Sequence, residues 1–140
     1  MNRFHRTFDL SLRFEEVKQA INIVWLKRDL RTQDHAPLAE AVASPLPFLV
    51  IYLFEPSLMA HPDTSNRHLR FIYASLKEMQ FKLNRSQIPL LILEAEALEA
   101  FKQLNEKLDI NQVLSHRESG VKQSWARDRS LGKFFKKQQI

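Results

Sequence analysis

Three short polar segments, each directly after an apolar β-rich run, carry the residue types of this sequence that best suit binding chemistry. They are Lys27, Arg28 and Asp29; Phe54 and Glu55; and His116, Arg117 and Glu118. Their cationic, aromatic and acidic groups suit a flat conjugated molecule with polar edges. Ligands of open α/β sheets bind beyond the carboxyl ends of the strands. We therefore predict that these residues form a cofactor-binding site, and we predict no catalytic residue.

The motifs of several common enzyme classes are absent. The two glycines, Gly120 and Gly132, cannot form the Gly-rich loop of a dinucleotide-binding or P-loop protein. Ser57, Ser65 and Ser86 lie in no nucleophile-elbow pattern. The five histidines are scattered without H-E-x-x-H spacing, and there is no cysteine. The sequence thus predicts that the protein has no metal site and no disulfide, and that it is located in the reducing cytoplasm.

The formal charge of +5 and the sequence pI near 9.7 raise the question of a polyanionic partner. We attribute the charge to ordinary amphipathic helices and to Lys133, Lys136 and Lys137, which suit the carboxyl end of a helix. Aromatic residues are not interleaved with basic ones on an evident strand, so direct nucleic-acid binding is not the expectation. No apolar run approaches the roughly 20 residues that cross a bilayer, so we expect a soluble protein without a membrane partner.

Apolar β-rich runs alternate with helical segments along the chain. The β-rich runs are Ile21–Leu26, Phe48–Phe54, Leu90–Leu93 and Gln112–Ser115. The helical segments are Ala36–Ala43, Ser65–Arg85, Ala97–Leu108 and Ser124–Gln138. Such alternation predicts an α/β fold with an open parallel sheet, and the continuous apolar strands predict helices on both faces.

One domain is predicted over 21–140, after a variable extension over 1–20 with a short helical turn at Glu15–Ala20. Ser65 is expected to cap its helix, and Pro37 to lie in a first helical turn. We expect Trp25 and Trp125 to be packing residues.

Several segments resemble the cryptochrome/DNA photolyase family. The stretch Ile23-Val-Trp-Leu-Lys-Arg-Asp-Leu-Arg-Thr-Gln-Asp-His-Ala-Pro-Leu38 is similar to the opening signature of that family. Further similarities follow in the same order, at Phe48-Leu-Val-Ile-Tyr-Leu-Phe-Glu-Pro56, Asn66-Arg-His-Leu-Arg-Phe-Ile-Tyr-Ala-Ser-Leu76, His116-Arg-Glu-Ser-Gly120 and Trp125-Ala-Arg-Asp-Arg129. The resemblance covers the amino-terminal α/β half of a family member and none of its large helical flavin domain.

The resemblance implies a Rossmann-like sheet of order 3-2-1-4-5, with the ligand crevice between the ends of strands one and four. Because the fifth strand would come after Gln138, we expect a truncated sheet of four strands with an exposed edge at strand four. Such an edge can pair with another chain, so we also expect self-association.

The family resemblance implies an antenna domain, which binds a light-harvesting chromophore and passes excitation to a flavin bound elsewhere, in blue-light DNA repair or photoreception. Deazaflavin, flavin mononucleotide and folate stay open as chromophores, although Gln123 and Ser124 replace the Asn-Glu pair of folate-binding members. FAD is expected only in a separate flavin-domain partner, and DNA only as a partner of the wider family protein.

The family includes deoxyribodipyrimidine photo-lyase, but the resemblance assigns no reaction to this part of it. Two alternatives stay open: a standalone nucleotide- or protein-binding α/β module, and a non-functional truncated gene product.

Overall fold

One parallel sheet organises the structure, a computed structural model that describes residues 19–140. Its strands are β1 (Ala20–Leu26), β2 (Phe48–Phe54), β3 (Leu90–Glu94) and β4 (Asp109–Leu114). They pair in the order β3-β2-β1-β4, with every pair parallel. The predicted fold class and strand order are therefore confirmed.

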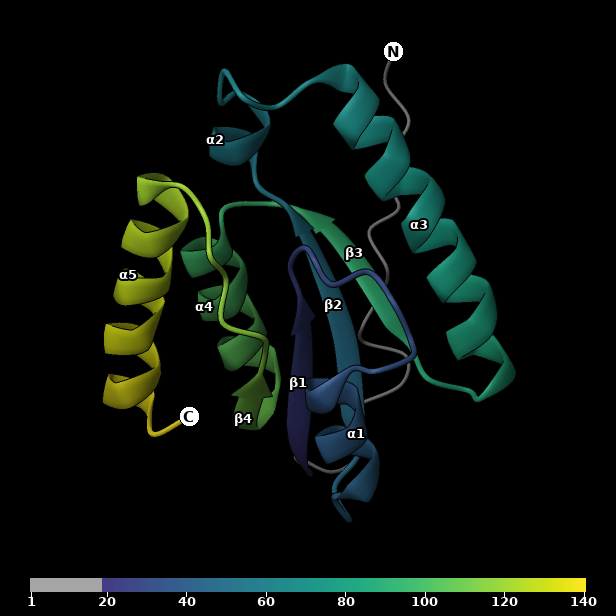
Figure 1. Cartoon of the computed structure of the whole chain (residues 1–140). Helices are drawn as coiled ribbons and strands as arrows, with labels where there is room; N and C mark the ends of the chain where they lie inside the picture. Colours follow the sequence, from purple (N-terminus) through teal and green to yellow (C-terminus); the bar gives the residue numbers. More distant parts are fainter. Residues whose placement is uncertain (1–18) are drawn as a thin grey trace.

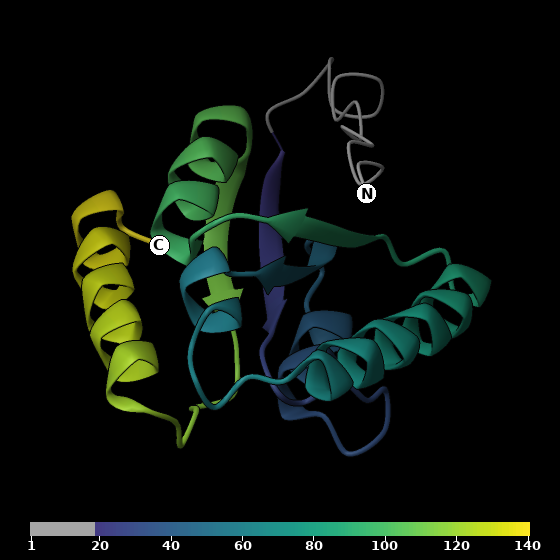
Figure 2. The same cartoon turned by 90° about the horizontal axis from the view of Figure 1, so that it is seen from above.

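Two pairs of helices cover the two faces of the sheet (Figures 1 and 2). Helices α1 (Ala36–Ala43) and α3 (Asn66–Arg85) pack on one face, and α4 (Ala97–Lys107) and α5 (Lys122–Gln138) lie on the other. The remaining helix, α2 (Pro56–Met59), is a single turn between β2 and α3.

Strand alternation separates two buried clusters. Ile23 and Trp25 of β1 point toward α4 and α5, whereas Val24 and Leu26 point toward α1 and α3. The central strands are buried on both sides, which explains their unbroken apolar sequences.

The predicted caps are confirmed. The Ser65 hydroxyl oxygen accepts a hydrogen bond from the His68 N–H, and Pro37 lies in the first turn of α1. Apart from shifts of one or two residues at the ends of other elements, two features differ from the sequence prediction. Helix α2 was not predicted because a four-residue turn has no helical periodicity, and β4 begins at Asp109, three residues early.

The sequence did not predict the start of β4 because this strand lies at the edge of the sheet. Asp109 and Asn111 are exposed on either side of buried Ile110, so this strand lacks the apolar run that marks a central strand. β4 pairs with β1 and with no other strand of residues 19–140. The expected extension also needs correction, because Ala20 is already in β1; residues 1–18, with most of the expected turn at Glu15–Ala20, lie outside the described part.

No helix within residues 19–140 combines the length and the apolar character that a membrane crossing requires.

Candidate functional site

An ionic network joins the carboxyl ends of the strands to α5, and its centre is Arg127. The Arg127 guanidinium places Nη1 2.5 Å from Glu55 Oε1, Nη2 2.6 Å from Glu118 Oε2, and Nε 2.9 Å from Asp128 Oδ1. Its side chain is 10% exposed, and those of Glu55 and Glu118 are 4% and 7% exposed. This side chain therefore links the segments after β2 and β4.

The turn after β1 joins the same network. Lys27 Nζ lies 3.1 Å from Asp128 Oδ2 and 4.5 Å from the ring centre of Trp25. Arg28 Nε lies 2.8 Å from Glu118 Oε1, with a side chain that is 69% exposed. The edge of the sheet is thus held by paired charges of both signs.

Burial shifts the ionisation of the groups around Arg127. It raises the pKa of Glu55, although the Arg127 guanidinium opposes the shift. Burial alone would lower the pKa of Arg127, but the Glu55 charge and the hydrogen bond to Glu118 outweigh it and raise the pKa. Burial, together with the charges of Glu55 and Glu118, raises the pKa of Tyr52 to about 12, so its hydroxyl remains a hydrogen-bond donor at neutral pH.

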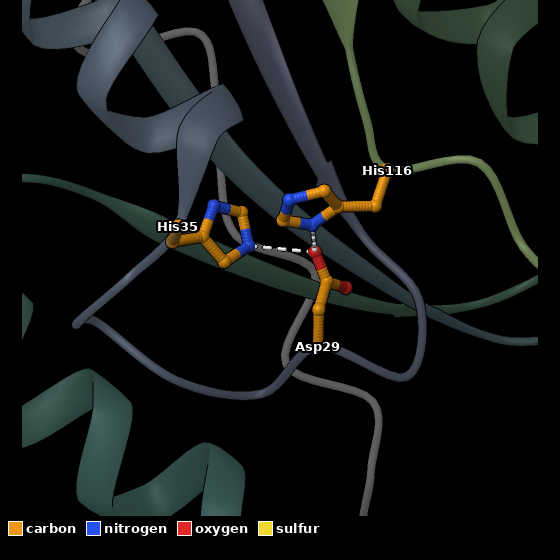
Figure 3. A group of neighbouring side chains, drawn as sticks. All are labelled: Asp29, His35 and His116. Carbon is orange, nitrogen blue, oxygen red and sulfur yellow. Dashed lines mark hydrogen bonds and ion pairs between the residues drawn. The ribbon is translucent and has the colours of Figure 1, made fainter.

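A second cluster lies between the ends of β1 and β4, where Asp29 faces two imidazoles (Figure 3). Its Oδ2 lies 2.6 Å from His116 Nδ1 and 2.6 Å from His35 Nε2, and its Oδ1 accepts a hydrogen bond from the Lys27 N–H. The His35 contact lacks the alignment of a hydrogen bond. His35 Nδ1 accepts the Leu38 N–H and so caps α1.

Opposing influences set the ionisation of this cluster. Burial raises the pKa of Asp29, but the hydrogen bonds from His116 and from the Lys27 N–H outweigh it, so the pKa is lowered overall. Burial lowers the pKa of His35 despite the nearby Asp29 carboxylate. We therefore describe the cluster as an ionised carboxylate beside a neutral, buried His35.

The ligand atoms of Asp29, His35 and His116 lie within 4.8 Å of one another, so this set has the composition of a two-histidine, one-carboxylate metal site. Two observations favour instead a carboxylate that is hydrogen-bonded to His116 and packed against a neutral His35. The N···O separations of 2.6 Å are shorter than the ~3.3 Å between two ligands of a tetrahedral ion. The cap bond also takes the lone pair of His35 Nδ1, which leaves the proton of neutral His35 on Nε2.

A cleft of about 630 Å³ opens beside this network, between the ends of β1 and β2 and the amino-terminal half of α3. Its volume is in the range of small-molecule sites. Apolar and aromatic side chains form much of its wall, among them Trp25, Leu58, Phe54, Leu69 and Ile72. Tyr52 also lines it and is 7% exposed, and no hydrogen bond of its hydroxyl occurs among residues 19–140.

The eight predicted site residues divide between these features. Five of them line the cleft: Lys27, Arg28, Phe54, Glu55 and Glu118. Asp29 and His116 belong to the histidine cluster, and Arg117 is exposed and lines no part of the cleft. The open space therefore lies beside β1 and β2, because the Asp29 cluster fills the gap between β1 and β4 where the crevice was expected.

The sequence prediction omitted two residues that organise the site. Arg127 was not among the predicted site residues, yet it joins Glu55 to Glu118. His35 carried one usable signal, its place directly before a Pro-containing helix start, which is the position of a cap.

Replacement of each glycine by alanine should have opposite effects on stability, at Gly132 inside α5 and at Gly120 in the loop before it. A Cβ at Gly120 would meet the buried Ser124 hydroxyl and would lie 3.1 Å from Glu118 Oε1, whereas one at Gly132 would meet nothing within 4 Å. We expect Gly132→Ala, inside α5, to raise the free energy of unfolding by about 0.5–1 kcal/mol. Gly120→Ala should lower it. Urea denaturation of both variants measures this, and a stabilised Gly120→Ala variant would contradict the described loop.

The fold and the site define a class: an open parallel α/β domain with a ligand-sized cleft at the carboxyl edge of its sheet. The family model described as DNA photolyase matches residues 22–140. The chain therefore belongs to the DNA photolyase family, as the sequence resemblance predicted, and corresponds to the amino-terminal domain of its members.

Three curated relatives agree with this assignment. The deoxyribodipyrimidine photo-lyase of Salmonella typhimurium is 31% identical over 97 residues, which are 66% of this chain and 20% of the relative. The enzyme of the same name from Synechococcus is 24% identical over 65% of this chain and 19% of its own length. Cryptochrome DASH of Synechocystis is 25% identical over 69% of this chain and 21% of its own length. The chain thus spans about a fifth of these relatives.

A solved structure shows the same fold. The cryptochrome of Synechocystis sp. PCC6803 superposes with a TM-score of 0.80 at 23% identity, over 86% of this chain and 26% of that one.

Proposed function

We propose that this domain is an antenna module, which holds a planar light-harvesting chromophore in the cleft and passes excitation to a flavin bound elsewhere in a photolyase or cryptochrome system. The main support is the cleft itself, with its volume of about 630 Å³ and its aromatic and apolar wall. Membership of the family supports the chromophore class, which includes deazaflavin, flavin mononucleotide and folate.

The polar groups of the cleft match such a molecule. The Tyr52 hydroxyl has no protein acceptor among the described residues and lines the cleft, so it can donate to a ring carbonyl oxygen. Arg28 pairs with Glu118 through Nε and is otherwise exposed at the cleft, so its terminal nitrogens face solvent and ligand. One buried donor and one exposed cation would orient a flat ring that the apolar walls enclose.

Binding of flavin mononucleotide to the purified chain tests this proposal. We expect quenching of the flavin fluorescence and flavin absorption that stays with the protein through gel filtration. Tyr52→Phe removes the hydroxyl alone and should weaken binding by about 0.5–1.5 kcal/mol, and Arg28→Ala by about 1–3 kcal/mol if a charged hydrogen bond is lost.

Arg70→Ala, an exposed change on α3 outside the cleft, is the matched control and should leave the affinity unchanged. Deazaflavin and folate probes extend the test, because failure of flavin mononucleotide alone leaves those two chromophores. If none of the three binds, the antenna function is wrong for this cleft, and the two alternatives, a nucleotide- or protein-binding module and a non-functional gene product, take its place. If a chromophore binds equally to all variants, its site lies elsewhere.

A further inference from the structure

The exposed charged residues on the outward face of α5 are all basic. Its exposed basic residues are Lys122, Arg129, Lys133, Lys136 and Lys137. At 3.6 residues per turn these side chains and Trp125 fall within a sector of about 120°, opposite the buried Leu131. Figures 1 and 2 show α5 at one side of the molecule, next to α4. This surface, the α5 basic face, is therefore open to a partner.

None of these five charges is neutralised within the described part of the chain. No ion pair of residues 19–140 involves them, and the single acidic residue of α5, Asp128, pairs with Lys27 and Arg127 instead. The exposed face of α4 differs from that of α5 because it carries charges of both signs, with Glu99 and Glu106 beside Lys102 and Lys107. A face of mixed charge is ordinary, whereas a face with only cations attracts polyanions.

Helix stabilisation explains part of this pattern but not all of it. Lys133, Lys136 and Lys137 lie near the carboxyl end of α5, where cations interact favourably with the helix dipole. Lys122 is the first residue of the helix, where the same dipole disfavours a cation. Trp125 is 57% exposed, so the expected packing role does not hold for it. These two residues have no structural explanation within the fold.

We infer that the α5 basic face binds single-stranded nucleic acid, with its cations on successive phosphates and Trp125 stacked on an unpaired base. Basic side chains that follow the backbone, combined with an aromatic side chain for stacking, are the two components of such binding sites. Lys122 to Lys136 spans about 21 Å along the helix axis, which is long enough for several phosphates.

An anionic lipid surface fits the described face less well. A membrane-bound amphipathic helix inserts its apolar side, and in α5 that side is buried: Leu131 is 1% exposed, and Phe134 and Phe135 pack against the core of the domain. Only Trp125 is left to insert. The interaction is independent of the chromophore proposal, because no residue of the α5 basic face lines the cleft.

Fluorescence anisotropy of the full chain with a labelled oligothymidylate tests the inference. The affinity should fall as salt rises, with a slope of log K against log salt near −0.7 per phosphate contact. The double variant Arg129→Glu, Lys133→Glu should bind at least tenfold more weakly. The double variant Lys102→Glu, Lys107→Glu on α4 makes the same change in net charge, and its loss should be several-fold smaller.

Trp125→Ala should weaken binding at least fivefold, because base stacking contributes about 1–3 kcal/mol. Trp125→Phe should recover most of that loss. The inference fails if the oligonucleotide does not bind at low salt, if the α4 and α5 charge variants lose affinity equally, or if Trp125→Ala binds as the native chain does. Tighter binding to vesicles containing phosphatidylserine than to the oligonucleotide would also overturn it.

Discussion

Replacement of Arg127 by Ala should lower the free energy of unfolding by about 3–5 kcal/mol, because it removes one partner of a buried ionic network. The Glu55 and Glu118 carboxylates are 4% and 7% exposed and would lose the cation between them. Urea denaturation at neutral pH measures the effect. Arg129→Ala, two residues further along the same helix and exposed, should change stability by less than about 0.5 kcal/mol.

The pH dependence of the stability of the Arg127→Ala variant tests the same explanation, the loss of the cation beside a buried carboxylate. Burial already raises the pKa of Glu55 in the native protein, and removal of the opposing cation should raise it further. A carboxyl group whose folded pKa is raised destabilises the fold above that pKa and less so below it. The stability difference between the variant and the native chain should therefore shrink as the pH falls toward the folded pKa of Glu55.

Glu55→Gln in the Arg127→Ala background should recover part of the lost stability, because it removes the Glu55 charge that is left without a cation, whereas Glu118 keeps its pair with Arg28. If Arg127→Ala costs less than about 1 kcal/mol, or if its loss is the same at acidic and neutral pH, buried charge pairing does not hold this edge of the sheet together.

Asp29→Ala is expected to have the next largest effect, a loss of roughly 2–4 kcal/mol, because hydrogen-bond donors around a buried carboxylate lose their acceptor. The Lys27 N–H and His116 Nδ1 donate to this carboxylate, and His35 Nε2 lies 2.6 Å from it. The matched control is Asp63→Ala, since the Asp63 side chain is 78% exposed and its contact with His61 is long, at 3.6 Å.

The sign of the pH effect at Asp29 is opposite to that at Glu55. Hydrogen bonds lower the pKa of Asp29 in the folded protein below its usual 3.8, so the stabilisation is present above that value and is lost as the pH falls through the folded pKa. Thermal melts of the native chain and Asp29→Ala should differ by a constant amount near neutral pH and should converge in strong acid. A constant difference down to the acid limit would show that the carboxylate charge contributes nothing.

The order of strands and helices was largely readable from the sequence alone, for a local reason. Strands buried on both faces need continuous apolar residues, and α3 needs apolar residues at spacings of three and four, so β1, β2 and α3 appear directly in the sequence. The start of β4 could not be read from the sequence, because an edge strand is exposed on one side and tolerates the polar residues Asp109 and Asn111.

Five of the eight predicted site residues line the cleft, because residues after parallel strands necessarily meet at one edge of the sheet. The partners of these residues could not be predicted. Arg127 reaches Glu55 across 72 positions of sequence, and His116 reaches Asp29 across 87, so these pairings depend on how α5 and the loop after β4 fold back over the sheet.

Tertiary structure alone decided which polar and aromatic groups are buried. Trp25 and Trp125 were both expected to be packing residues, yet Trp25 is 3% exposed and Trp125 is 57% exposed. His35 is buried beside Asp29, whereas His68 at the start of α3 is exposed. The composition of the chain establishes which chemical groups are available. Their burial and their charged partners follow from long-range packing, which brings together residues that no local pattern relates.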